Sequence, residues 1–118
     1  MLTQICPKLP MRNKNKTRDF YIQKLEFKEF GSPDFDGYLM LEKDHIQIHF
    51  FEFPTLDPSQ NYGQVYIRLN NIDNFYQTVL DSKIWIQPNG QLQTKPWGQR
   101  EFSILDPDNN LLTFGQGV

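Results

Sequence analysis

The side chains that could carry out covalent chemistry are few in this sequence, which holds two histidines, His45 and His49, and one cysteine, Cys6. The histidines are four residues apart, but they lie in a stretch with strand periodicity and so do not form the paired ligands of a helical zinc site. His49 is expected to be a hydrogen-bonded pocket residue rather than a general base. Cys6 is expected to be a small buried side chain, because no base is identified beside it and a nucleophilic thiolate needs one. With no glycine-rich phosphate loop and no nucleophile elbow, the sequence favours binding over covalent catalysis.

A larger set of polar and aromatic residues shares one face of the predicted strands. Alternate side chains of a strand point to opposite faces, so Ile46, Ile48 and Phe50 are expected to pack under a helix while the residues between them point away. The residues predicted to line that opposite face as a cup are Gln47, His49, Phe51, Gln64, Tyr66, Arg68, Glu101, Ser103 and Thr113. A wall that is both polar and aromatic is expected of a ligand site and is unusual for a dry core.

The elements that position this face form two similar halves. The periodicity predicts strands at 2–9, 26–30, 38–41, 46–53, 63–69, 82–86, 100–105 and 110–114, and helices at 17–25 and 72–80. Asn71 is a candidate N-cap of the second helix. The helix pattern Asp19-Phe20-Tyr21 returns as Asn74-Phe75-Tyr76, either as an internal repeat or by coincidence between two amphipathic helices. We predict an α+β fold in which two βαβββ modules, 1–53 and 63–118, are joined by a linker at 54–62 and form a single domain, 1–118.

The end of the chain is predicted to be a β-hairpin. Between its strands, Pro107 presets the backbone of a turn, and Asn109 or Asn110 can take the left-handed conformation that such a turn often needs. Trp97 and Gly98 open the hairpin. Trp97 has two interpretations at this point, a stacking surface over a cavity or a core residue at the rim of the sheet.

Composition limits the classes of function. The 118 residues carry a net charge of −2, which argues against a nucleic-acid surface, and no apolar run is long enough to span a membrane. A single cysteine excludes a disulfide framework and favours a reducing compartment, so we expect a soluble cytoplasmic protein. Aromatic residues make up 14% of the chain, an excess that favours a pocket for a flat organic ligand.

The order of elements and several motifs resemble the glyoxalase/bleomycin-resistance/extradiol-dioxygenase superfamily, the vicinal oxygen chelate fold, and within it the bleomycin-resistance proteins. The motifs that carry the resemblance are Pro96-Trp97-Gly98-Gln99-Arg100-Glu101-Phe102, Leu105-Asp106-Pro107-Asp108 with Asn110, Asp34-Phe35 with Gly37, and Asp19-Phe20-Tyr21. The resemblance implies a strongly curved eight-stranded mixed sheet with helices on its outer face. It also implies a homodimer, often with the first strand exchanged, so that each cavity is shared by two chains.

Enzymes of this superfamily hold a divalent metal at four positions, which fall here near Cys6, Phe51 or Glu52, Gln64 and Thr113. Only Gln64 and Glu52 are chemically adequate, since a hard cation prefers several anionic oxygens or imidazoles. We therefore expect no metal and no cofactor. A shift of register in the first or fourth strand would change this assignment.

The resemblance favours a metal-free protein that sequesters a cationic aromatic glycopeptide antibiotic of the bleomycin type and so confers resistance. Phe35 and Trp97 would stack on its planar part, with Asp34 and Glu101 among the acidic groups that attract its positive charges. Arg68 and Arg100 are expected to pair with carboxylates. One departure is that Gln64 and Tyr66 stand where the resistance proteins have a pair of tryptophans. A metal-dependent enzyme of the glyoxalase or dioxygenase type, and a binder of an unidentified ligand, remain alternatives.

Overall fold

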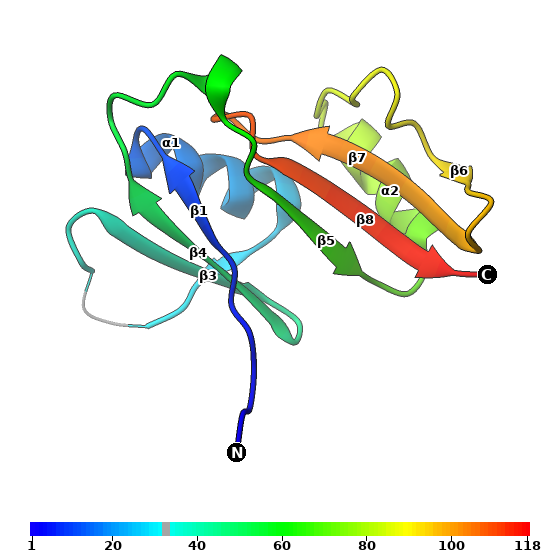
Figure 1. Cartoon of the computed structure of the whole chain (residues 1–118), viewed down its shortest axis with the longest axis horizontal. Helices are drawn as coiled ribbons and strands as arrows, with labels where there is room; N and C mark the ends of the chain where they lie inside the picture. Colours follow the sequence, from blue (N-terminus) through cyan, green and yellow to red (C-terminus); the bar gives the residue numbers. More distant parts are fainter. Residues whose placement is uncertain (32–33) are drawn as a thin grey trace.

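The computed structural model describes residues 1–31 and 34–118, whose elements form two successive βαβββ modules (Figure 1). Module one consists of β1 (Lys8–Met11), α1 (Lys14–Asp19) with the π-helical turn η1 (Phe20–Lys24), β2 (Lys28–Glu29), β3 (Tyr38–Lys43) and β4 (Ile46–Glu52). Module two consists of β5 (Gln64–Arg68), α2 (Ile72–Asp81), β6 (Gln93–Thr94), β7 (Gln99–Leu105) and β8 (Leu111–Gly117). The connection between the modules contains the short 3-10 helix η2 (Pro58–Gln60). The predicted α+β class and module order are confirmed.

The eight strands are hydrogen-bonded as two mixed sheets of four, in the orders β1-β4-β3-β2 and β5-β8-β7-β6. In each sheet the first strand of the module runs parallel to the last, and the other neighbours are antiparallel. The two modules thus share one topology, as the repeated helix pattern predicted. In Figure 1 both helices lie behind the strands, on the same side of the sheets. Within the described residues, no helix is long and apolar enough to cross a membrane.

Strand β1 begins later than the predicted strand at 2–9. It starts directly after Pro7, whose carbonyl accepts a hydrogen bond from the backbone N–H of His49 at 2.9 Å. Pro10 lies inside β1, which is possible because β1 is an edge strand and one side of its backbone needs no ladder partner. The helix after it also begins earlier than predicted, at Lys14, because the side chain of Asn13 accepts a hydrogen bond from the Lys16 N–H at 3.1 Å.

Two local predictions in module two are wrong. Asn71 does precede α2, but its backbone is left-handed at φ 59° and its side chain makes no capping bond; the side-chain oxygen of Gln116 accepts from the Ile72 N–H instead. The stretch 82–86 is not a strand, and within it only Ile86 makes an isolated bridge, to Ile104. Ile84 is buried and Ile86 packs against the core, whereas Trp85 is largely exposed. The strand that pairs with β7 is β6.

The closing hairpin forms as predicted, with β7 paired to β8 over their whole lengths. Asn109 takes the left-handed conformation of the turn at φ 63°. The Asp106 carboxylate accepts hydrogen bonds from the backbone N–H groups of Asp108 and Asn110, both at 2.9 Å. This buried turn also joins the modules, because the hydroxyl of Tyr21 in η1 donates to Asp106 Oδ2 at 2.7 Å.

The helix-facing side chains of both modules form one hydrophobic core. Ile48 and Phe50 of β4, like Phe102 and Ile104 of β7, are at most 1% exposed, so the predicted helix-facing sides of these strands are confirmed. The side chains between them point to the opposite face. That face carries the candidate site.

Candidate functional site

Glu101 of β7 is the centre of a polar cluster on the open face of module two. Its side chain is 8% exposed, and its Oε2 atom accepts two hydrogen bonds, from the Tyr66 hydroxyl at 2.7 Å and from the Trp97 indole N–H at 3.1 Å. In the described part of the chain, Glu101 takes part in no ion pair. A buried carboxylate held only by neutral donors keeps one oxygen available for a cationic ligand.

The two donors are positioned by different elements. Tyr66 lies on β5 and reaches across β8, where Gly115 leaves room for its ring. Burial, and then the bond to Glu101, raise the pKa of the Tyr66 hydroxyl, so it remains a donor. Trp97 lies in the turn before β7, is 64% exposed, and has the ammonium of Lys95 5.8 Å from its ring centroid. Of the two interpretations of Trp97, the structure supports an exposed aromatic surface rather than a core position.

Further residues of the predicted face surround this cluster. The Arg68 guanidinium donates to Gln99 Oε1 at 3.0 Å, so Arg68 pairs with an amide and not with a carboxylate as predicted. The hydroxyls of Ser103 and Thr113 lie 3.0 Å apart on the paired strands β7 and β8. Gln64 is exposed at the start of β5.

A second cluster lies on the open face of module one and is built around His49. The Tyr38 hydroxyl is 2.8 Å from Nδ1 of His49, and Nε2 of His49 is 3.0 Å from Gln47 Oε1. The thiol of Cys6 is 3.9 Å from the same Gln47 oxygen. Burial, and then the positive charge of Lys8, lower the pKa of His49, which favours the neutral ring. A neutral ring that accepts from Tyr38 and donates to Gln47 satisfies both of its nitrogens.

Sequence reasoning missed two members of these clusters, Tyr38 and Gln99. Period-2 alternation places Gln99 with Glu101 and Ser103, but the predicted strand began one residue too late to include it. The same alternation in β3 places Tyr38 on the open face, where it pairs with Phe51 of β4. Both residues could have been found by extending the face analysis to the full length of each strand.

Two predicted site residues, Arg100 and Asp34, lie outside both of these clusters. Arg100 shares the helix-facing side of β7 and pairs with Asp73 of α2, with Nη2 and Oδ1 2.8 Å apart. Arg100 thus pairs with a carboxylate as expected, but on the side of β7 opposite to Glu101. Asp34 binds Lys14 and Arg18 beside α1, and the hydrogen bond from Lys14 lowers the pKa of the Asp34 carboxyl. Much of its charge is already paired within module one.

Phe35 is half exposed and follows the part of the loop, 32–33, that lies outside the described residues. In Figure 1 this loop lies at the left end of the molecule, next to the grey trace, whereas β6 and the start of β7 lie at the right end. The loop that carries Phe35 and the turn that carries Trp97 therefore lie at opposite ends of one chain.

The positions that hold metal in the related enzymes do not provide a suitable donor set here. Cys6 offers a thiol near Gln47, Gln64 offers a neutral amide, and the Thr113 hydroxyl is bonded to Ser103. Glu52 is the one carboxylate among them. No group of three or more histidine, cysteine, aspartate or glutamate side chains converges within residues 1–31 and 34–118. These residues do not fit a hard divalent cation.

Comparison with known proteins gives consistent results. The family model described as a glyoxalase-like domain matches residues 5–118. A bleomycin resistance protein of Geobacillus stearothermophilus is 28% identical over an alignment of 133 residues that covers 99% of this chain and 98% of the relative. One from Klebsiella pneumoniae is 29% identical, covering 95% of this chain and 90% of the relative. The crystal structure of a bleomycin-binding protein complexed with bleomycin superposes with a TM-score of 0.86 at 26% identity, covering 99% of this chain and 100% of that one.

Proposed function

The chain belongs to the glyoxalase-like domain family, and from this premise we propose that it binds a cationic aromatic glycopeptide of the bleomycin type. The ligand would be sequestered without being chemically changed. Similarity to bleomycin resistance proteins over nearly the whole chain supports this proposal, as does the structural similarity to a bleomycin-bound protein. Capture of this kind requires a shaped, charged surface and no nucleophile.

The observation that carries the proposal is the orientation of Trp97. Its indole N–H is bound to Glu101 at 3.1 Å, yet its side chain is largely exposed, so one edge is fixed and a face is free to stack. Stacking on such a ring contributes about 1 kcal/mol beyond burial. A positively charged group over the same ring or beside the Glu101 carboxylate adds further attraction.

We further propose that the binding cavity lies between two copies of the chain. The loop that carries Phe35 and the turn that carries Trp97 lie at opposite ends of one molecule, so a ligand held between these rings requires the second ring from a partner. The apolar side chains of Met1, Leu2 and Ile5 are fully or almost fully exposed in the extended N-terminal segment. An exposed apolar segment of this kind is expected to pack on another protein surface, and a second copy offers one.

Metal-dependent chemistry is not part of this proposal, because the four corresponding positions offer one carboxylate, one amide, one thiol and an occupied hydroxyl. Metal analysis of protein purified without chelator checks this part separately. We expect far less than one equivalent of zinc, nickel, manganese or iron per chain. A stoichiometric metal would contradict it and favour the enzyme alternative.

The binding proposal is tested by titration with bleomycin, monitored by tryptophan fluorescence and calorimetry. The chain has two tryptophans, so Trp85→Phe leaves Trp97 as the only reporter and serves as the matched control. We expect saturable quenching in the wild type and in Trp85→Phe. Trp97→Ala should lose this quenching and bind at least tenfold more weakly by calorimetry, since about 1.4 kcal/mol corresponds to a factor of ten. Absence of binding by the wild type, or unchanged affinity in Trp97→Ala, would contradict the proposal.

A further inference from the structure

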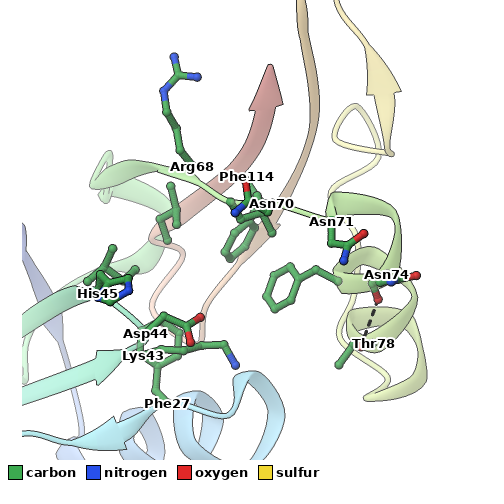
Figure 2. A pocket seen from close by; sticks show the side chains of 14 residues that line it. Phe27, Lys43, Asp44, His45, Arg68, Asn70, Asn71, Asn74, Thr78 and Phe114 are labelled. Atoms are coloured by element: carbon green, nitrogen blue, oxygen red, sulfur yellow. Dashed lines mark hydrogen bonds between the residues drawn. The ribbon is translucent and has the colours of Figure 1, made fainter. Parts of the chain in front are cut away.

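A cavity of about 560 Å³ lies on the helix side of the molecule, away from the face that carries Glu101 and His49. It lies between the β3–β4 turn of module one and the start of α2 in module two (Figure 2). Its volume falls within the range of small-molecule sites in proteins. Of the predicted site residues only Arg68 borders it, and in Figure 2 the guanidinium of Arg68 points away from the hollow. This cavity is therefore a candidate site distinct from the proposed bleomycin site.

The apolar part of the cavity wall is aromatic and comes from both modules. Phe27 is contributed by module one, and Phe75 and Phe114 by module two. The rings of Phe75 and Phe114 are 4.9 Å apart between centroids at an interplanar angle of 59°. Phe114 and Phe27 are buried, whereas Phe75 is half buried, so Phe75 presents ring surface to the hollow. A flat aromatic guest could contact this ring.

The polar part of the wall is rich in side-chain amides. Asn70, Asn71 and Asn74 line it at the start of α2, and no hydrogen bond within the described part of the chain engages their amide groups. Asn71 adopts a left-handed backbone and its side chain does not cap the helix, while Gln116 binds the Ile72 N–H. Its amide is thereby left to border the cavity (Figure 2). An asparagine amide presents a donor and an acceptor side by side, which matches the paired donor and acceptor on the edge of a nucleobase.

The charges around the cavity balance. Lys43 contributes a positive charge, and its ammonium is 6.0 Å from the centroid of Phe75 and 3.7 Å from the Glu26 carboxylate. Asp44 contributes a negative charge from the adjacent turn. The other cation of the lining, Arg68, donates to Gln99 and points away from the hollow. With Lys43 beside one carboxylate and Asp44 next to it, the wall gives no advantage to an anionic guest.

We propose that this cavity is a second ligand site, which binds a neutral planar heteroaromatic molecule of the nucleobase or nucleoside class. The Phe75 ring contacts the face of the heterocycle, and the amides of Asn71 and Asn74 bind its polar edge. Stacking of a base on an aromatic side chain and a paired amide contact are interactions of known strength in nucleic-acid recognition. The proposal does not depend on bleomycin binding.

The test is a titration with adenosine followed by NMR. The readout is the chemical shifts of the backbone and side-chain amide groups. We expect saturable chemical-shift changes confined to the cavity lining, including Asn71 and Asn74. Asn74→Trp, at an exposed helix position, fills the mouth and should abolish these changes. Gln77→Trp, on the same helix but outside the lining, is the matched control and should bind like the wild type. Asn71→Gly keeps the left-handed backbone while removing the amide and should weaken adenosine binding at least fivefold.

Adenosine monophosphate distinguishes a neutral site from a phosphate site and should bind no more tightly than adenosine. Tighter binding of the monophosphate, non-saturable shifts, or unchanged binding in Asn74→Trp would overturn the proposal. Chemical-shift changes at Tyr66 and Trp97 would also overturn the proposal, because they would place adenosine on the face that carries Glu101. The adenosine experiment can be interpreted even if bleomycin does not bind, because the two ligands are monitored at different residues.

Discussion

Tyr66 occupies the space that a side chain at position 115 would need. A Cβ atom built on Gly115 would lie 1.9 Å from the Tyr66 hydroxyl oxygen and 2.5 Å from its Cζ atom. The missing side chain lets the Tyr66 ring lie across β8, so that its hydroxyl reaches Glu101 on β7 at 2.7 Å. Gly115 therefore determines the position of Tyr66, and with it the hydrogen bond to Glu101.

Gly115→Ala is expected to displace Tyr66 and break its bond to Glu101. Because a hydrogen bond of this kind contributes about 0.5–1.5 kcal/mol, and more when one partner is charged, bleomycin affinity should fall by about three- to tenfold in calorimetry. Gly117→Ala is the matched control, since the nearest atom to its added Cβ is Gln99 Nε2 at an ordinary 3.6 Å. Equal affinities in the two variants would show that the position of Tyr66 does not matter for binding.

The buried bond between Tyr21 and Asp106 is expected to stabilise the contact between the modules. Tyr21→Phe removes the hydroxyl that donates to Asp106 Oδ2 at 2.7 Å and leaves a buried carboxylate with one donor fewer. The free energy of unfolding should fall by about 1–3 kcal/mol, measured by chemical denaturation.

Tyr76→Phe provides the control for this change, because Tyr76 is the counterpart of Tyr21 in the repeated helix pattern. Its hydroxyl makes no hydrogen bond within the described residues, and its ring packs edge-on against Phe102. We expect a change below about 0.5 kcal/mol, as for substitutions away from special features. A similar loss in both variants would attribute the effect to the ring environment and not to the buried bond.

Much of the site was predictable from the sequence because strand alternation is a strict geometric rule. Once Ile48 and Phe50 are assigned to the core, Gln47 and His49 must point to the opposite face, and the structure places them there. The same reasoning located Tyr66 and Glu101. Arg100 shares the helix-facing side with Phe102 and Ile104 by the same rule, and there it pairs with Asp73 of α2.

Other features depend on contacts that a single sequence does not reveal. The N-terminus of α2 is capped by Gln116, a residue distant in sequence, so the local rule that selects Asn71 as a cap could not find it. Ile84 and Ile86 have the composition of a strand, but the left-handed backbone of Lys83 and the close packing of Gly90 against Ser103 direct that segment over the core. The distance between Phe35 and Trp97 is likewise a property of the whole fold.

His49 is expected to make both folding and ligand binding sensitive to acid. Burial and the charge of Lys8 lower its pKa below the ordinary 6.5, so between these two pKa values the unfolded chain binds more protons than the folded one. The stabilising contribution is therefore complete above the ordinary pKa and is lost as the pH falls through the lowered pKa. Tyr38 and Gln47, which bind the neutral ring, and Lys8, which opposes a second positive charge, all act in this direction.

Denaturation and bleomycin titrations between pH 7.5 and about pH 5 check this prediction. His49→Gln should reduce the acid-induced loss of stability and of affinity, because a protonated His49 would also repel a cationic ligand. His45→Gln removes the other histidine of the chain, which lies in the β3–β4 turn, and should keep the wild-type pH dependence. A profile that is the same in the wild type and in His49→Gln would exclude His49 as the titrating group.

The exposed N-terminal segment is expected to contribute to self-association. It extends away from both sheets in Figure 1, and its Leu2 and Ile5 side chains are almost fully exposed. Burial of a Leu or Ile side chain contributes about 1.5–3 kcal/mol. The double variant Leu2→Ser/Ile5→Ser should therefore weaken dimerisation at least tenfold in sedimentation equilibrium. Val118→Ser, an exposed apolar residue at the other terminus, should not. A wild-type protein that stays monomeric at high micromolar concentration would contradict the proposal of a cavity shared by two chains. Phe35 of one chain and Trp97 of another would then not contact the same ligand.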